Sequence, residues 1–180
     1  MNLFIAPHND DEALFGAFTL MREHPLVVIV TDSWIQRNRG TSITADERWL
    51  ETKNAMDSLG CSVIRLGIRD DVIDEWSVKD KLSRFYGFDH VYAPAVQGGN
   101  KDHDLIGKIA EEIFGHTMTV VFKQYSTYAS GEFYNPGHIP VTPTEQEIEL
   151  KNKALQFYTS QLRINPQHFE AVKGKPEWFI

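Results

Sequence analysis

The sequence predicts an α/β fold, a three-layer α/β/α sandwich built on a Rossmann-like, mainly parallel sheet. Short apolar runs typical of strands alternate along the chain with periodic patterns typical of helices. This alternation favours a parallel sheet whose crossover connections are right-handed. Leu26 to Thr31 is also an unbroken run of apolar and β-branched residues, as expected of a strand that is buried on both faces of such a sheet.

The first half of the chain is expected to hold three strands and two helices. The second helix begins after Thr44, because Thr44 and Glu47 have the spacing of a capping box, and Gly60 ends it. In chain order, the expected elements are a strand from Asn2 to Ala6, a helix from Ala13 to Arg22, a strand from Leu26 to Thr31, a polar loop from Asp32 to Ile43, a helix from Thr44 to Leu59 and a strand from Cys61 to Leu66.

The second half continues the alternation and then loses it. The last helix is expected to begin at Thr144, which can act as its cap, and the tail from Gln161 to Ile180 has no clear period. The expected elements are a helix from Ser77 to Tyr86, a strand from His90 to Ala93, a helix from Asp104 to Phe114, a strand from Thr117 to Phe122, a loop or irregular hairpin from Tyr125 to Pro143 and a helix from Thr144 to Tyr158.

The composition indicates one globular domain over residues 1–180 and excludes several classes of protein. The net charge of −7 argues against nucleic acid and anionic membranes as general partners. The single cysteine, Cys61, excludes internal disulfides and a cysteine-rich metal cluster. No apolar stretch approaches the length of a membrane span, and the N-terminus lacks the features of a signal peptide, so a cytoplasmic protein is expected.

A histidine and three acidic residues follow the first expected strand directly, in the stretch Ala6 to Glu12. Ligands bind at the carboxyl ends of strands in open α/β sheets, and so many anions repel one another unless a cation lies among them. His8 and Asp11 offer the nitrogen and oxygen ligands that zinc accepts, and Asp10 is placed to act as a base on metal-bound water. The alternative is that Asn9 to Glu12 cap the following helix and complement its dipole.

A second polar cluster, Gly98 to Asp104, follows the fourth expected strand. Because the carboxyl ends of parallel strands meet at one edge of the sheet, His103 can approach His8 and Asp11. Two imidazoles and a carboxylate leave a fourth zinc position open, which is typical of a catalytic site. Asp102 is expected to accept a hydrogen bond from an imidazole and to fix its orientation. Taken alone, His103 would be interpreted as a surface loop histidine, and only its placement beside the first cluster favours a ligand.

Both clusters resemble motifs of a known family. Pro7 to Glu12, Pro-His-Asn-Asp-Asp-Glu, resembles the Pro-His-x-Asp-Asp-Glu motif of the PIG-L/LmbE-like family of zinc-dependent N-acetylglucosaminyl deacetylases. Asn100 to His103 resembles the family's His-x-Asp-His motif, with Asn100 in the place of its first histidine. The resemblance implies that the zinc ligands are His8, Asp11 and His103 and that the general base is Asp10.

Two expected helices add to the resemblance. Arg48 to Gly60 resembles the family's Arg-x-x-Glu…Ala…Leu-Gly helix, which implies that Arg48, with Glu51 beside it on one helix face, binds the substrate. The alternative is an ordinary surface ion pair between the two. Lys151 to Gln161 resembles the family's C-terminal Lys-x-x-Ala…Tyr-x-Ser-Gln helix, for which packing is the expected role.

The chain departs from the family's pattern at Asn100. The family's histidine there is associated with the transition state, whereas an amide can only donate a neutral hydrogen bond. His138 and Tyr128 are the candidates to supply the missing help, and His138 is favoured because only an imidazole changes charge near neutral pH. The segment Tyr125 to His138 would then form a lid or pocket wall; the alternative is a small satellite core under a long loop. The remaining histidines, interpreted as structural or solvated, are His24, His90, His116 and His168.

The resemblance covers Leu3 to about Leu162, leaves residues 163–180 outside, and implies a zinc-dependent hydrolase. It would remove an N-acetyl or other acyl group from an N-acetylglucosaminyl-type sugar or conjugate, with Asp10 taking the proton of the attacking water. The expected partner is a small-molecule amino-sugar conjugate, and a homo-oligomer is left open.

Two alternatives remain for the function. One is a different metal-dependent hydrolase, such as an enzyme with two metal ions. The other is a binding protein that keeps zinc and sugar but, because of Asn100, has lost turnover. A dinucleotide-binding Rossmann protein is disfavoured, since the first strand–helix turn has no glycine fingerprint.

Overall fold

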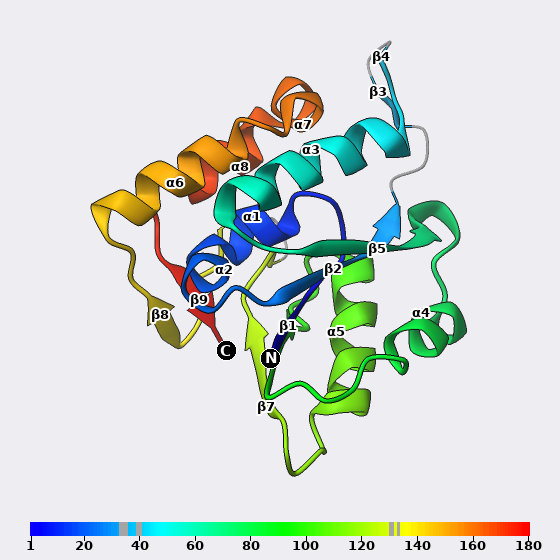
Figure 1. Cartoon of the computed structure of the whole chain (residues 1–180). Coiled ribbons are helices and arrows are strands. Elements are labelled where there is room, and N and C mark those ends of the chain that lie inside the picture. The colour runs from blue at the N-terminus through cyan, green and yellow to red at the C-terminus, as the bar shows by residue number, and fades with distance from the viewer. Residues whose placement is uncertain (33–35, 39–40, 130–131, 133) are drawn as a thin grey trace.

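The computed structural model describes residues 1–32, 36–38, 41–129, 132 and 134–180, and within them the α/β fold is confirmed (Figure 1). A mostly parallel sheet has the strand order β5-β2-β1-β6-β7-β9-β8, and helices cover both of its faces. The strands are β1 (Asn2–Ala6), β2 (Leu26–Asp32), β3 (Gln36–Asn38), β4 (Thr41–Ile43), β5 (Val63–Arg69), β6 (His90–Pro94), β7 (Val121–Tyr125), β8 (Ile139–Val141) and β9 (Glu177–Phe179). The helices are α1 (Asp11–Phe15), α2 (Ala17–Glu23), α3 (Ala45–Leu59), α4 (Glu75–Leu82), α5 (Lys101–Phe114), α6 (Glu145–Leu155), α7 (Thr159–Ile164) and α8 (Pro166–Val172).

The central strand β1 separates two hydrophobic cores. Phe4 and Ala6 point into the core beneath α1, α3, α6 and α8, whereas Leu3 and Ile5 point into the core beneath α4 and α5. Successive side chains of a strand face opposite sides of a sheet, so both sides of β1 must be apolar. This is the physical reason for the uninterrupted apolar runs in the sequence, and Figure 1 shows the two helical layers on either side of the sheet.

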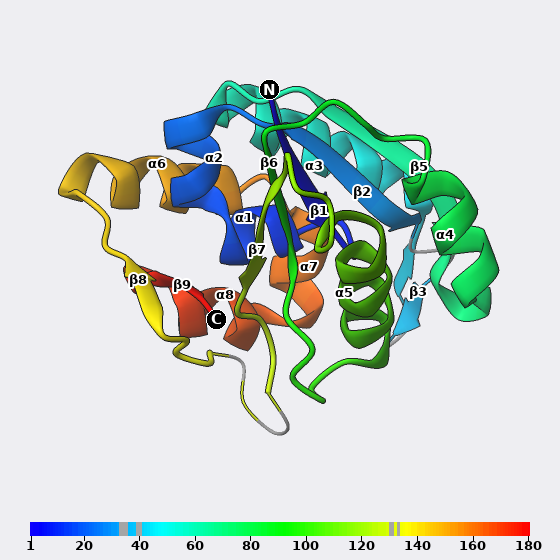
Figure 2. The same ribbon diagram turned by 90° about the horizontal axis from the view of Figure 1, so that it is seen from below.

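The carboxyl ends of β1 and β6 lie side by side. The two strands are parallel neighbours, with Phe4 opposite Tyr92, and β1 pairs in parallel with β2 on its other side. The loops after β1 and β6 therefore leave the sheet at the same edge. Figure 2 shows that β8 and β9 lie at the opposite end of the sheet from β5.

The helix expected from Ala13 to Arg22 is wrong as a single element. It begins earlier, at Asp11, and Gly16 divides it into α1 and α2. A Cβ atom on Gly16 would lie 2.2 Å from the ring of Phe4, so only glycine allows the chain to approach β1 this closely. The break lets α1, which begins within the acidic motif, pack against the carboxyl end of β1.

Several other boundaries differ from the sequence predictions. The expected loop from Asp32 to Ile43 contains the antiparallel pair β3 and β4, with residues 33–35 and 39–40 outside the described residues. The strand expected from Thr117 to Phe122 is instead Val121–Tyr125, and α5 begins at Lys101 rather than at Asp104. The other strand and helix predictions shift by a few residues. The capping box at Thr44 and the helix cap at Thr144 are confirmed, and Thr144 also forms a capping box with Glu147.

The tail that showed no period forms α7, α8 and β9. Strand β9 pairs antiparallel with both β7 and β8 and so joins the edge strand β8 to the rest of the sheet. Among the described residues, no helix combines the length and the hydrophobicity needed to traverse a bilayer.

A buried ion pair fastens β9 to the helical layer. Lys151 Nζ donates to Glu177 Oε1 at 2.8 Å, and both side chains are at most 3% exposed. The Glu177 carboxylate also accepts the backbone N–H of Phe18, while Lys151 Nζ donates to the backbone oxygen of Leu14 at 2.8 Å. The pair therefore joins α6, β9, α1 and α2 at one point.

We expect Glu177→Ala to lower the free energy of unfolding by about 3 to 5 kcal/mol, because it leaves the Lys151 ammonium buried without its carboxylate. Urea denaturation measures the change. Glu170→Ala is the matched control: its ion pair with Lys173 is exposed, with an N–O distance of 3.5 Å, and its loss should change stability by no more than about 0.5 kcal/mol. Equal unfolding midpoints for the two variants would contradict the role given to Glu177.

Candidate metal centre

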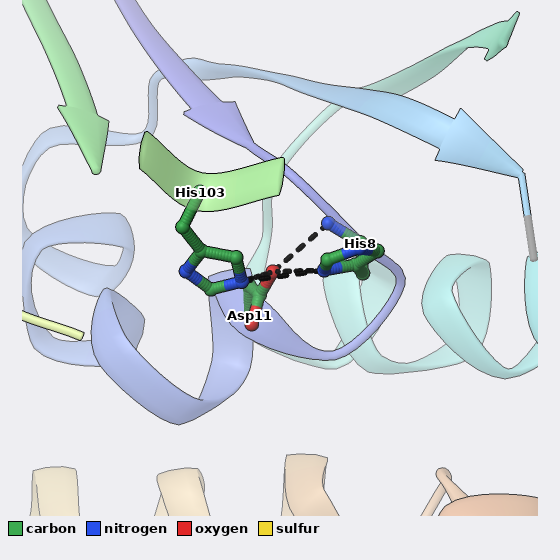
Figure 3. Close-up of side chains that lie close together, drawn as sticks. All are labelled: His8, Asp11 and His103. Atoms are coloured by element: carbon green, nitrogen blue, oxygen red, sulfur yellow. Dashed lines mark hydrogen bonds and ion pairs between the residues drawn. The ribbon is translucent and has the colours of Figure 1, made fainter. Parts of the chain in front are cut away.

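Three side chains from distant parts of the chain converge at the carboxyl ends of β1 and β6. His8 lies in the turn after β1, Asp11 is the first residue of α1, and His103 lies in the first turn of α5. Figure 3 shows the ring of His103 and the carboxylate of Asp11 directed toward the ring of His8. The side chains of Asp11 and His103 are 1% exposed, and that of His8 is 16% exposed.

The geometry of this His8–Asp11–His103 group fits a metal ion. His8 Nδ1 lies 3.2 Å from His103 Nε2, and Asp11 Oδ2 lies 3.2 Å and 3.0 Å from these two nitrogens. Two ligand atoms at zinc-binding distances on a tetrahedron are about 3.3 Å apart. Two imidazole nitrogens and one carboxylate oxygen are also ligands that zinc accepts. The group is therefore a possible metal-binding site, with its three ligand atoms all within 4.8 Å of one another.

Asp102 lies behind His8, as an orienting group should. Its Oδ2 atom is 3.0 Å from His8 Nε2, the ring nitrogen that faces away from the group. Burial opposes a charge on the His8 ring, but the hydrogen bonds with Asp102 and Asp11 outweigh it and raise the pKa of His8 to about 10 in the metal-free protein. Burial likewise acts against ionised Asp11, and the two imidazoles overcome it and hold the pKa of Asp11 well below its ordinary value.

Asp10 sits beside the group in a strained conformation. Its φ of 119° lies in a region that favours glycine, and although it occupies the N-cap position of α1 its side chain makes no capping hydrogen bond. Simple capping thus fails to explain this residue. Burial, opposed by Arg48 and assisted by Asp11, raises the pKa of Asp10 to about 7.

Glu12, the third acid of the motif, binds a backbone N–H group rather than the His8–Asp11–His103 group. Its carboxylate accepts the backbone N–H of Asp10 at 3.0 Å and the hydroxyl hydrogen of Tyr158. Burial is the main cause that raises the pKa of Glu12, to about 8. Glu12 therefore holds the strained residue Asp10 in place and ties it to the segment that follows α6.

Arg48 is buried at the site, so the surface ion pair considered from the sequence is wrong. Its side chain is 3% exposed; its Nη2 atom lies 3.1 Å from Asp10 Oδ2 and donates to the backbone oxygen of Asn9. Glu51, predicted to accompany it at the substrate, is engaged elsewhere. Its carboxylate accepts hydrogen bonds from the Thr159 hydroxyl and from the backbone and hydroxyl of Ser160, at the start of α7.

Asn100 is the N-cap of α5. Its side-chain oxygen accepts the backbone N–H of Asp102 at 2.9 Å. The residue therefore orients the helix turn that carries Asp102 and His103, a role for which asparagine is well suited.

The prediction that His138 folds over the site is wrong. His138 is exposed and directly precedes β8, the edge strand of the sheet. Three strands, β6, β7 and β9, separate β8 from β1. With neighbouring strands about 4.8 Å apart, His138 lies roughly 19 Å from the line of β1.

Tyr128 lies against the group instead, and His168 lies against Tyr128. The ring of Tyr128 is 5.2 Å from the ring of His103 and 5.0 Å from that of Phe15, measured between centroids. His168 Nδ1 lies 3.4 Å from the Tyr128 hydroxyl oxygen. From the sequence, His168 was interpreted as structural or solvated. No signal pointed to it, because the tail has no period and lies outside the resemblance.

Comparisons with known proteins agree with this architecture. Residues 3–114 match the PIG-L family, described as GlcNAc-PI de-N-acetylase. A search of curated proteins finds no match.

Solved structures share the fold at low sequence identity. The zinc-inhibited form of teicoplanin deacetylase Orf2 has a TM-score of 0.75 and 16% identity, covering 99% of this chain and 97% of that one. The conserved protein TT1542 from Thermus thermophilus has a TM-score of 0.71 and 20% identity, covering 99% and 93%. GalB, the 4-carboxy-2-hydroxymuconate hydratase from Pseudomonas putida KT2440, has a TM-score of 0.58 and 15% identity, covering 99% and 94%.

These structures establish the fold, and a hydratase among them shows that the fold alone does not decide the reaction. The family is decided by the sequence match, which covers more than half of the chain and includes both clusters that supply His8, Asp11 and His103. The chain belongs to the PIG-L family.

Proposed function

We propose that this protein is a zinc-dependent hydrolase that removes an N-acetyl group from an N-acetylglucosaminyl-type sugar or conjugate. The observation that carries the proposal is the convergence of His8 Nδ1, Asp11 Oδ2 and His103 Nε2 on one point, with the Asp10 carboxylate beside them. The family description supports the sugar class and the deacetylation. The mixture of nitrogen and oxygen ligands supports zinc.

His8, Asp11 and His103 would hold the zinc ion, which polarises an amide carbonyl and activates water when bound. Asp102 keeps the His8 ring in place through Nε2, so that Nδ1 remains directed at the group. Asp10 is the general base: its carboxylate takes a proton from the attacking water and returns it to the leaving amine. Arg48 Nη2 and the Glu12 carboxylate fix Asp10 from two directions.

Substrate contacts are assigned to Arg48 and Tyr128, which flank the group. Arg48 presents a planar guanidinium, suited to paired oxygen atoms of a sugar or phosphate. Tyr128 presents an aromatic ring, and such rings stack against sugar faces. Glu51 acts indirectly, because its carboxylate anchors α7 through Thr159 and Ser160.

A second candidate function, a binding protein without turnover, is favoured by one observation. The side-chain oxygen of Asn100 caps α5, and an amide stands where the family's imidazole is expected. A test for acetate release separates the two functions directly.

Metal analysis and an acetate-release screen over N-acetylglucosaminyl compounds test the proposal. We expect one zinc ion per chain and release of acetate from at least one compound. His8→Ala and His103→Ala should lose the metal, whereas Asp10→Asn should keep it and lose roughly a hundredfold or more in kcat. His116→Ala, at an exposed position, is the control and should keep both. Stoichiometric zinc in both ligand variants, or no acetate from any compound, would refute the proposal.

Arg48→Lys should lower kcat/KM by about 10- to 100-fold, equivalent to one or two lost charge-assisted hydrogen bonds. A lysine ammonium cannot hold Asp10 and the Asn9 carbonyl in the same forked geometry. Steady-state kinetics measures the change. Arg84→Lys serves as control, because the Arg84–Asp80 pair is exposed. If both variants behave like the parent, Arg48 has no part in catalysis or substrate binding.

Asp10→Asn should also change how the stability of the metal-free protein depends on pH. Burial raises the pKa of Asp10 from an ordinary 3.8 to about 7. Ionisation of this buried carboxyl therefore lowers the free energy of unfolding of the parent as the pH rises between these two values. From about pH 4.5 to about pH 8, the variant should therefore gain about 3 to 4 kcal/mol relative to the parent. Urea unfolding in the presence of a chelator measures the difference, and a difference independent of pH would contradict the burial of an ionisable Asp10.

A further inference from the structure

Tyr128 and His168 form a pair of polar groups, and Tyr128 lies beside the His103 ring of the metal group. Tyr128 and His168 both lie outside residues 3–114, which match the family. Neither residue belongs to a motif that carried the resemblance. The pair is therefore a feature of this chain that the family match does not assign.

Tyr128 is fixed beside His103 by its backbone as well as by its ring. Ala129, the next residue, forms a β-bridge with Gly98 in the loop before α5. A Cβ atom on Gly99 would lie 2.2 Å from the Tyr128 carbonyl oxygen, so the loop can approach only because this residue is glycine. The backbone of Tyr128 cannot move away from His103 without breaking this contact.

His168 is held by a helix that packs on the acidic motif. The residue belongs to α8, whose Phe169 lies 6.2 Å from the ring of Tyr158 between centroids. The Tyr158 hydroxyl in turn donates to Glu12 in α1. The positions of His168 and of the His8–Asp11–His103 group are thus set by the same contacts.

The Tyr128 hydroxyl is a hydrogen-bond donor at neutral pH. The ordinary pKa of a tyrosine hydroxyl is about 10. Burial lowers the pKa of His168, which favours the neutral ring with a single N–H. A tyrosine has one hydroxyl hydrogen, so a bond donated to His168 would leave none for the substrate.

We propose that Tyr128 is the oxyanion-binding catalytic residue of this chain and that His168 is its positioning residue. The inference rests on the proposed deacetylase function. His168 donates its Nδ1–H to the Tyr128 oxygen and so directs the Tyr128 hydroxyl hydrogen toward the amide oxygen of the substrate. The distance of 3.4 Å is long for such a bond, as is common before substrate binds. The pair supplies a hydrogen-bond donor in a chain where Asn100 stands in the place of the family's histidine.

Kinetics of single and double variants tests the pair. Tyr128→Phe should lower kcat by about 10²- to 10³-fold, the usual effect of removing an oxyanion donor, with little change in KM or metal content. His168→Ala should lower kcat by a smaller factor, and the double variant should be no slower than Tyr128→Phe, because His168 acts through Tyr128. His168→Asn, whose amide can donate from the Nδ1 position, should recover part of the loss.

Tyr86→Phe and His116→Ala, both at exposed positions, are the matched controls and should leave kcat unchanged. Wild-type kcat in Tyr128→Phe would overturn the inference. So would full additivity in the double variant, which would show that the two residues act separately.

A spectroscopic measurement is independent of turnover. ¹⁵N NMR of the His168 ring should show the hydrogen on Nδ1, and Tyr128→Phe should shift the Nδ1 resonance. A hydrogen on Nε2 would overturn the hydrogen-bond direction, whatever the activity.

If the wild-type protein releases no acetate, the proposed function fails and the catalytic role of Tyr128 falls with it, while the ring-nitrogen signals still decide whether the pair exists. Normal acetate release with an unaltered rate in Tyr128→Phe would overturn the inference alone.

Discussion

The structure depends on the burial of carboxylates at the edge where β1 and β6 end. Asp11 is almost completely removed from solvent, yet its carboxylate is ionised because two imidazoles lie within hydrogen-bond distance. Each neighbouring acid has its own partners. Asp10 lies beside the guanidinium of Arg48, and Glu12 accepts hydrogen bonds from the Tyr158 hydroxyl and from a backbone N–H. The segments that supply these partners, α3, α5 and the residues after α6, are thereby fixed relative to β1.

The parts of the fold that follow from local sequence could be predicted. Apolar runs such as Leu26 to Thr31 reveal a sheet covered on both faces, and Thr44 and Thr144 mark helix starts through short-range hydrogen bonds. The prediction that His103 approaches His8 and Asp11 follows from parallel strand order and is confirmed by the geometry. What failed depends on contacts between distant residues: the break at Gly16 is imposed by Phe4, and no pattern within the helix announces it.

The same contrast between local sequence signals and contacts of distant residues holds for the site. Asp102 was expected to orient an imidazole because the two polar clusters lie on adjacent strand ends, and it contacts His8. The displacement of His138 to the edge of the sheet could not be foreseen, because β8 joins the sheet through β9, whose residues lack a strand-like period. For the same reason the place of His168 could not be predicted, since it depends on the packing of α8 against Tyr158 through Phe169. The tail thus places β8, and His138 before it, at the edge of the sheet and brings His168 against Tyr128.

The ion pair between Lys151 and Glu177 has a consequence for how the protein is made. Glu177 bonds to Phe18 across 159 positions of sequence, and β9 enters the sheet between strands that precede it in the chain. During synthesis the N-terminal part of a chain emerges first, and contacts between distant residues form last. A growing chain therefore contains His8, Asp11 and His103 well before His168 and Glu177 leave the ribosome. The His8–Asp11–His103 group and the C-terminal segments of the fold are therefore separated in time, and the sheet is complete only when β9 is in place.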